Sequence, residues 1–531
     1  MQMNPFEIKA EILNIISDCA EETDIRQLEY RVSELDKQAD KFSIEKILFR
    51  ELLHVKTPQE KVLRFLLQRY VPKDRLIEQL WNVLRNNMTS SEVKIIVLSY
   101  LRELETDWKY EDFEGALGQD VDILDEDTKR LLGEAIINPE VQIDFLDFLS
   151  SVKQEDKALL LQSLAEDYSK DELANILIPV FLAEPKSELG QKALELLAQT
   201  RSQLAYHAIN SALKNADEDL KPLLKKNLSV LKLSGVREDN SIEFYKQLLS
   251  SSRPYRCCAT YVDGQGNQAL IFSRTNKEKR VQFVAIVVND YNGIRDCFGF
   301  NDISEFECDK IIERFCRDDK HLPLPPSVLK TLLKYGERIT ATKTDSKKLP
   351  YEYVCWKNIM TDIEPEEPNF DEILSKYYEV REVSRDDLSD ILGADFTERW
   401  FLDPNYSSEY EAFLEILDVE ILDTNFDIDR MIDEYLTKIF YSDEYNVWKE
   451  RLLVTAYMKH ADRDDEVANI LYSIYHQKAV YDEFLKMILR KSVYEYYFSL
   501  KYNTEYNQNK FTTKQLDDII LSIENKWVNN V

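Results

Sequence analysis

The fold is decided by Arg256-Cys-Cys-Ala-Thr-Tyr-Val262, Gln268-Ala-Leu-Ile-Phe-Ser273 and Val281-Gln-Phe-Val-Ala-Ile-Val-Val288, which carry the clearest β-strand patterns in the chain. The turn Asp263-Gly-Gln-Gly-Asn267 separates the first two, and its glycines can adopt positive φ angles at low cost. The third stretch is continuously apolar, as is typical of a central strand. We therefore predict a meander of three antiparallel strands between Pro254 and Phe300.

Helices are predicted to follow this meander and to complete a small α/β module. Ser304 and Glu307 have the spacing of a capping box, and a stripe of apolar residues runs from Ile303 to Phe315. A second helix is predicted over Ser327–Thr340. We place the module at residues 241–345, between an N-terminal helical domain at 1–240 and a C-terminal acidic helical domain at 346–531.

Composition favours long helices on both sides of the module. Glycine accounts for only 11 of the 531 residues, well below the ~7% of average proteins. The chain is 44% hydrophobic and 31% charged, which is typical of globular proteins. The predicted fold class is therefore mostly α, with helices joined by short turns.

Helical pairs repeat at a fixed interval after Asn138-Pro139. First helices are expected to start near Glu140, Asp171 and Ser202, and second helices near Glu155, Ser187 and Glu218, at intervals of about 31 residues. Two helices per unit at such a period indicate an α-solenoid of antiparallel helix pairs.

This pattern resembles HEAT/armadillo-type helical repeats. The resemblance is carried by Pro179 in a first helix and by Ala193, Leu194 and Leu197 in the second helix that follows. It covers residues 126–235 best and Pro5–Glu105 more loosely, with a period shorter than is usual in that class. It implies a solenoid fold and a habit of protein binding, and it implies no activity.

The charge of the chain bears on its partners. Asp and Glu number 98 against 68 Lys and Arg, a formal charge of −30, which would repel a phosphate backbone. We expect no nucleic-acid partner, and a protein partner with a basic surface or segment is favoured. The start Met1–Glu7 lacks a signal-peptide pattern, and the longest apolar stretches are far too short to cross a membrane. A cytoplasmic protein without a membrane partner is predicted.

A few residues near the predicted strand ends could form an active site: Asp263, Asp290, Arg295, Asp296 and Cys297. We favour the interpretation that the aspartates serve the turns, because nothing in the sequence places these groups near one another. A nucleophilic pair of Cys297 with His321 is conceivable, although nothing in the sequence brings the two together. Gly264-x-Gly266 lacks the third glycine of a dinucleotide-binding loop, and no Gly-Lys-Ser/Thr phosphate loop occurs. We therefore predict no cofactor.

Metal sites find little support in the sequence. Six of the seven cysteines lie between Cys257 and Cys355, but none form a Cys-x-x-Cys pair, and Cys257 and Cys258 would face opposite sides of a strand. Buried reduced thiols are predicted, with a zinc or redox role as the alternative. The stretch Asp423–Glu434 resembles a calcium loop, but Ile428 replaces its required glycine. The expectation there is a helix start capped by Thr424 or Asn425. The five histidines are scattered.

These observations predict a non-catalytic protein–protein interaction scaffold or adaptor built on helical repeats. The alternative is a hydrolase- or lyase-like enzyme with its active site in the central module.

Overall fold

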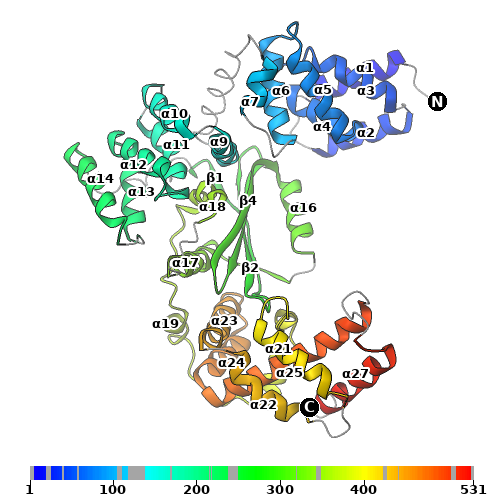
Figure 1. Ribbon diagram of the computed structural model, residues 1–531, viewed down its shortest axis with the longest axis vertical. Coiled ribbons are helices and arrows are strands. Elements are labelled where there is room, and N and C mark those ends of the chain that lie inside the picture. The colour runs from blue at the N-terminus through cyan, green and yellow to red at the C-terminus, as the bar shows by residue number, and fades with distance from the viewer. Residues whose placement is uncertain are drawn as a thin grey trace.

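The computed structural model describes most of the chain and places one sheet between groups of helices (Figure 1). In its described residues it has 24 α-helices and one antiparallel sheet of five strands, so the protein is mostly α. The described residues are 5–19, 25–38, 41–56, 59–104, 110–117, 138–152, 154–167, 170–214, 216, 218–236, 249–317, 320–342, 349–422, 427–440, 442–503 and 510–527.

The first group of helices has a hydrophobic core of its own. Its buried side chains run from Ile8 to Leu117 and form one cluster. The helices are α1 (Pro5–Asp18), α2 (Ile25–Gln38), α3 (Lys41–Leu52), α4 (Glu60–Tyr70), α5 (Lys73–Arg85), α6 (Ser91–Leu104) and α7 (Tyr110–Leu117).

The second group consists of the repeating pairs, and their predicted starts are confirmed to within three residues. The helices are α9 (Pro139–Ser151), α10 (Gln154–Asp167), α11 (Lys170–Ala183), α12 (Glu188–Gln199), α13 (Gln203–Lys214) and α14 (Lys221–Leu233). First helices α9, α11 and α13 pack in sequence, and so do second helices α10, α12 and α14. The buried residues of this group, Val141 to Val236, form a second separate cluster. A further helix predicted over Asn240–Ser250 lies largely outside the described residues.

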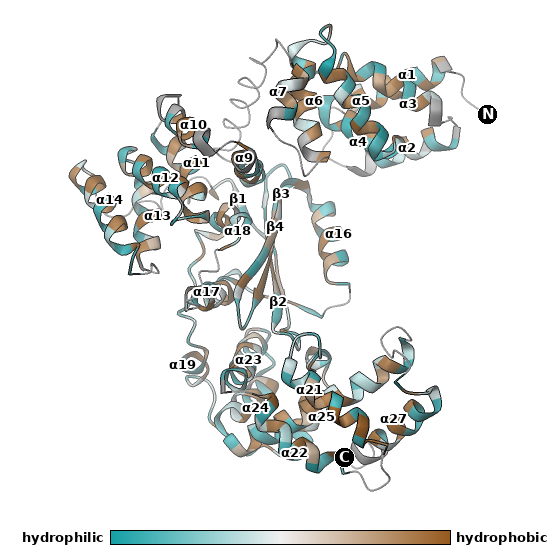
Figure 2. Ribbon diagram, viewed as in Figure 1, coloured by the Kyte–Doolittle hydropathy of each residue, from teal (hydrophilic) through white to brown (hydrophobic). Residues whose placement is uncertain are grey.

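The central sheet has the order β4-β3-β2-β1-β5, with every neighbour antiparallel. Its strands are β1 (Ser252–Thr260), β2 (Asn267–Asn276), β3 (Arg280–Asn289), β4 (Gly293–Ser304) and β5 (His321–Pro323). The hairpin of β1 and β2 and the central place of β3 were predicted correctly. Much of the length of the strands is hydrophobic (Figure 2).

The prediction of three strands was wrong, because β4 and β5 extend the sheet at its two edges. β4 lies at an edge and has exposed charged side chains and two glycines, so its sequence lacks the apolar pattern of β3. One of those glycines, Gly299, is needed because a Cβ atom there would lie 2.6 Å from the carbonyl oxygen of Phe283. β5 is three residues long, too short to show any periodicity.

Different helices cover the two faces of the sheet. α16 (Glu305–Phe315) packs on one face over Ile271, Phe283 and Ala285. The opposite face is covered by α17 (Pro326–Thr342) and α18 (Tyr351–Trp356), the latter followed by the 3₁₀ turn η2 (Lys357–Met360). Both helices predicted to follow the meander are confirmed, although Ile303 belongs to β4.

The predicted capping box at the start of α16 is present. Ser304 Oγ accepts a hydrogen bond from Glu307 N at 3.2 Å, and Glu307 Oε2 accepts one from Ser304 N at 2.8 Å. Replacing Ser304 with alanine is expected to weaken the helix by about 1 kcal/mol, because an N–H of its first turn loses its acceptor. Faster amide exchange in α16, with unchanged exchange in α17, would be the measured sign.

The C-terminal helices share a continuous hydrophobic core with the sheet. One cluster of buried residues runs from Ala259 on β1 to Ile523 near the C-terminus. The helices are α19 (Phe370–Leu374), α20 (Arg385–Gly393), α21 (Ser408–Glu420), α22 (Ile428–Ile439), α23 (Ser442–Ala461), α24 (Asp465–His476), α25 (Lys478–Tyr502) and α27 (Thr513–Trp527), with the 3₁₀ turn η3 (Asp395–Thr397) after α20. The predicted boundaries at 240 and 345 stay predictions.

Two further sequence expectations concern this part of the chain. Asp427, rather than Thr424 or Asn425, caps α22, and its Oδ1 accepts from Asp429 N at 3.2 Å. Asp427 takes this place because it is the residue directly before the first helical residue, Ile428. The preceding positions 423–426 of the calcium-like stretch lie outside the described residues. None of the described helices is both long and apolar enough to span a membrane.

Candidate functional site

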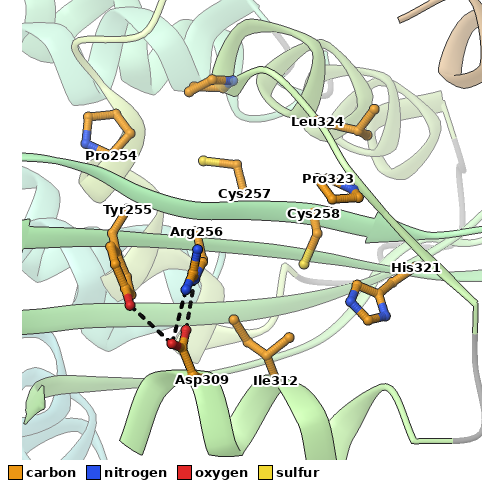
Figure 3. Close-up of a pocket in the computed structure, with 11 residues that line it drawn as sticks. Pro254, Tyr255, Arg256, Cys257, Cys258, Asp309, Ile312, His321, Pro323 and Leu324 are labelled. Atoms are coloured by element: carbon orange, nitrogen blue, oxygen red, sulfur yellow. Dashed lines mark hydrogen bonds and ion pairs between the residues drawn. The ribbon is translucent and has the colours of Figure 1, made fainter. Parts of the chain in front are cut away.

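A pocket of about 490 Å³ opens at the outer edge of β1, between α16 and the start of α17 (Figure 3). Its lining comes from three parts of the chain: residues Pro254–Cys258 of β1, Asp309 and Ile312 of α16, and the segment that leads from β5 into α17. The last part contributes His321, Pro323, Leu324 and Pro326. The side chains lie on both sides of β1, so the pocket straddles the edge of the sheet.

The edge of β1 is only half covered. β5 pairs with Cys258–Thr260, and Leu324 N donates one further hydrogen bond to Cys257 O at 3.0 Å. The chain then turns away into α17. Among the described residues no strand pairs with Ser252–Arg256 on the side away from β2. Part of this backbone is already bonded or lacks a donor, since Ser252 O accepts from Arg274 Nη2 at 3.2 Å and Pro254 has no N–H.

A β-bulge shapes this open half. The register of β1 on β2 shifts between Pro254 and Cys257, where Tyr255 and Arg256 together oppose Ser273. The Ser273 hydroxyl fills the gap, accepting from Arg256 N at 2.9 Å and donating to Arg256 O at 3.2 Å. A bulge of this kind turns two consecutive side chains toward the same face.

Both side chains bind Asp309 on α16. Arg256 donates to the two carboxylate oxygens at 2.7 and 3.0 Å, and the Tyr255 hydroxyl donates at 3.1 Å. The hydrogen bonds from Arg256 lower the pKa of Asp309, while burial and the nearby carboxylate raise the pKa of Tyr255 to about 12. At neutral pH the cluster holds a carboxylate, a guanidinium and a protonated phenol in fixed positions.

The two cysteines of the pocket lie on opposite faces of β1, as predicted. Cys258 belongs to the core under α16, whereas Cys257 packs against the core on the α17 side. Burial raises the pKa of both thiols to about 12. The thiolate is the nucleophilic form of cysteine, so burial holds both side chains in the less nucleophilic thiol form at neutral pH. All seven cysteines are free.

Two of the sequence-predicted site residues, Asp263 and Asp290, come together at the other end of the sheet. Asp263 stabilises the β1–β2 turn, where its Oδ1 accepts from Gln265 N and Asn267 N at 2.9 and 2.8 Å. The Asp290 side chain is only 6% exposed and forms an ion pair of 2.7 Å with Arg451 Nε on α23. Asp263 therefore stabilises a turn, which was the favoured interpretation for this residue. Asp290 forms a structural ion pair.

The other three candidates lie on β4. Arg295 and Asp296 are exposed, and Asp296 Oδ1 accepts a hydrogen bond from Cys297 N at 2.8 Å. Cys297 is buried in the core on the α17 side, and burial raises its pKa. β4 and β5 form opposite edges of the sheet, so Cys297 and His321 are not neighbours. Within the described ranges no three His, Cys, Asp or Glu side chains are grouped so that they could hold a metal ion.

The pocket could not be predicted from the sequence, because the pocket depends on the short strand β5 and on the β-bulge of β1. A three-residue strand has no pattern, and bulges leave little trace in a sequence. One signal was available: Pro254 and the run Pro323-Leu-Pro-Pro326 are typical of an edge where pairing stops.

Comparison of the chain with protein-family models, with curated proteins and with solved structures gave no match.

Proposed function

We propose that this chain is a non-catalytic protein–protein interaction scaffold that holds a partner at the open edge of β1. The observation that carries the proposal is the pocket itself, about 490 Å³ at the outer edge of β1, where no described strand covers Ser252–Arg256. Its lining combines a few fixed polar groups, such as Arg256 and Asp309, with apolar side chains such as Ile312, Leu324 and Pro326. A partner would be held there by side-chain contacts with this lining.

The helices around the sheet complete the proposed scaffold. We include in the proposal an α-solenoid of antiparallel pairs, which is supported by the two sequential layers α9–α11–α13 and α10–α12–α14. The formal charge of −30 favours a partner with a basic surface, since the field of the whole chain steers its approach. A reducing compartment such as the cytoplasm is part of the proposal, and the seven free cysteines support it.

A pocket-filling variant tests this function. Pro323 is exposed, lines the pocket and has no N–H to lose, so Pro323→Trp places an indole in the groove while the sheet keeps its hydrogen bonds. We expect a protein that is captured by the wild-type chain to be lost, by at least about tenfold in affinity, from this variant. The measurement is quantitative mass spectrometry of proteins captured by each chain, followed by binding measurements on the purified partner.

Met88→Trp is the matched control, because Met88 is 91% exposed and lies in the first helical group, away from the pocket. It should capture the same partner as the wild type. Circular dichroism must show both variants folded. Identical sets of captured proteins for all three chains would refute the pocket as the binding element.

A further inference from the structure

We infer that a row of aromatic side chains at the seam between α25 and α27 binds an arginine-bearing segment of a protein partner. This surface lies apart from the pocket at β1, whose lining comes from β1, α16 and the segment that leads from β5 into α17. The seam therefore goes beyond the proposed function of the pocket, and the two surfaces can be tested separately.

Two contacts fix how α25 and α27 lie against each other (Figure 1). Lys501 Nζ of α25 lies 2.8 Å from Asp517 Oδ1 of α27. Seven residues earlier on α25, the Tyr494 hydroxyl donates to Glu524 Oε1 at 3.0 Å, seven residues later on α27. The two helices are therefore antiparallel at this seam, and the side chains between the two contacts on each helix lie next to each other.

Aromatic side chains follow α25 along this seam. Tyr494, Phe498 and Tyr502 are spaced four residues apart, which places them on the same face of the helix. The ring centroids of Tyr494 and Phe498 are 5.8 Å apart, and those of Phe498 and Tyr502 are 4.8 Å apart. The three rings thus form one continuous row. The antiparallel register places Leu521 of α27 beside the middle ring.

The row is open to solvent. Tyr502 is 68% exposed, Leu521 is 55% exposed and Phe498 is 39% exposed. On the inner side of the same helix, Tyr497 and Leu500 are almost completely buried. Single exposed apolar residues are normal on a protein surface, whereas a contiguous apolar patch indicates an interaction site.

Carboxylates border the row and determine which partner fits it. Asp517 and Glu524 stand at the two contacts between the helices, and Asp518 is exposed on the next position of α27. The hydrogen bond to Asp517, together with the nearby charge of Glu524, raises the pKa of Lys501. A second cation would gain from the same carboxylates, whereas an anionic segment would be repelled.

The contacts of Lys501 show how a cation is held at this seam. Its Nζ lies 5.4 Å from the centroid of the Tyr502 ring while it pairs with Asp517. One cation is thus shared between an aromatic face and a carboxylate. Arginine suits such a place better than lysine, because its planar guanidinium stacks on a ring and still donates to a carboxylate.

Glu524 is the carboxylate that a partner's arginine would use. In the described part of the chain it accepts one hydrogen bond, from Tyr494, and a carboxylate can accept up to about four. An arginine stacked on the neighbouring Phe498 ring would therefore find a free acceptor at its edge. A second copy of this chain fits less well, because two such seams would bring their acidic borders together.

The test uses a fluorescent peptide in which four arginines alternate with Gly-Ser pairs, and its affinity for the intact chain is measured by anisotropy. Two matched peptides carry lysine, which has the same charge, or citrulline, which has a similar shape without the charge. The double variant Phe498→Leu with Tyr502→Leu keeps apolar bulk on the helix but removes two ring faces. Tyr406→Leu is the matched control, because Tyr406 is 72% exposed and lies outside the seam.

We expect the arginine peptide to bind wild type at least about threefold more tightly than the lysine peptide, and the citrulline peptide not to bind. The double variant should weaken binding of the arginine peptide by at least about fivefold, since two cation–π contacts are lost. Glu524→Gln should weaken it as well, whereas Tyr406→Leu and Pro323→Trp should bind like wild type. Circular dichroism must show every variant folded.

Three outcomes would overturn the inference. If arginine and lysine peptides bound equally well and the double variant bound both like wild type, attraction by net charge alone would explain the binding. If wild type self-associated in sedimentation and the double variant did not, the seam would belong to a second copy of this chain. If Pro323→Trp rather than the double variant lost the arginine peptide, the cationic segment would belong to the pocket, and the proposed function would stand without the seam.

Discussion

Arg451→Met is expected to lower the free energy of unfolding of the sheet and C-terminal helices by about 3–5 kcal/mol, because it leaves a buried carboxylate without its counter-ion. The side chains of Arg451 and Asp290 are only 3% and 6% exposed, and they are joined at 2.7 Å. Arg451 also donates to Gly264 O at 3.3 Å and lies over the ring of Trp448 at 3.9 Å. One guanidinium therefore holds the β1–β2 turn, the end of β3 and α23 together.

The loss of unfolding free energy caused by Arg451→Met should become smaller as the pH falls. Burial raises the pKa of Asp290, and Arg451 opposes that rise, so the variant has the higher folded-state pKa. The unfolded chain has an Asp pKa of about 3.9. The folded variant thus binds the proton more tightly than the unfolded chain. Its stability relative to wild type should recover as pH falls from 7 toward about 4.

The pH dependence of this stability difference can be measured by hydrogen exchange of the β2 and β3 amides at several pH values. These amides lie in the core that the sheet shares with the C-terminal helices, so their exchange reports the opening of that core. Adding Asp290→Leu to Arg451→Met should restore part of the loss, since no unpaired charge then remains. Arg430→Met is the control: its ion pair with Glu434 is exposed and should contribute no more than about 0.5 kcal/mol. If the loss of unfolding free energy stayed constant over the whole pH range, an unpaired buried carboxylate at Asp290 could not be its cause.

Gly264→Ala is expected to lower the free energy of unfolding by about 1–3 kcal/mol, as overpacking does in a core. The substitution affects the packing of the β1–β2 turn on residues 399–401. A Cβ atom at Gly264 would overlap the carbonyl oxygen of Phe401 and lie 2.6 Å from that of Arg399. Both obstacles are backbone atoms, and the segment that carries them is fixed by Trp400, whose Nε1 donates to Val262 O at 2.7 Å. Neither side can move away at low cost.

Gly393→Ala is the matched control for this substitution. Nothing lies within 4 Å of a Cβ atom at Gly393, so alanine at the end of α20 should be neutral or slightly stabilising. Both variants can be compared by the exchange of amides in β1 and β2. If both variants showed the same amide exchange, the turn would tolerate a side chain at position 264, and its close packing on residues 399–401 would not stabilise the sheet.

The centre of the sheet could be predicted from sequence because its signals are local. Apolar β-branched residues mark β3, and the Asp-Gly-Gln-Gly-Asn turn marks the hairpin, in which Gly266 has a φ of +86°. The edges could not be predicted. β4 combines exposed charged residues with buried ones such as Ile294 and Cys297 without a regular alternation, and β5 is defined only by its pairing with β1.

The candidate site shows the same limit more strongly. Asp290 stood out as a charged residue after a strand, but its partner Arg451 is 161 residues away in sequence. The groove requires β1, α16 and the β5–α17 segment to meet, and no local pattern encodes such a meeting. The interaction function itself stays a proposal.

The shared core of the sheet and the C-terminal helices has a consequence for the time course of synthesis. When α17 has just been made, roughly 180 residues remain before Ile523 is added, which takes on the order of 10–40 s on the ribosome. Val284, Ile286 and Val288 lie on the face of the sheet that α17 and α18 cover, in the same hydrophobic cluster as the helices still to be made. A nascent chain at this stage carries a nearly complete sheet with one face only partly covered, which is the kind of surface that chaperones hold.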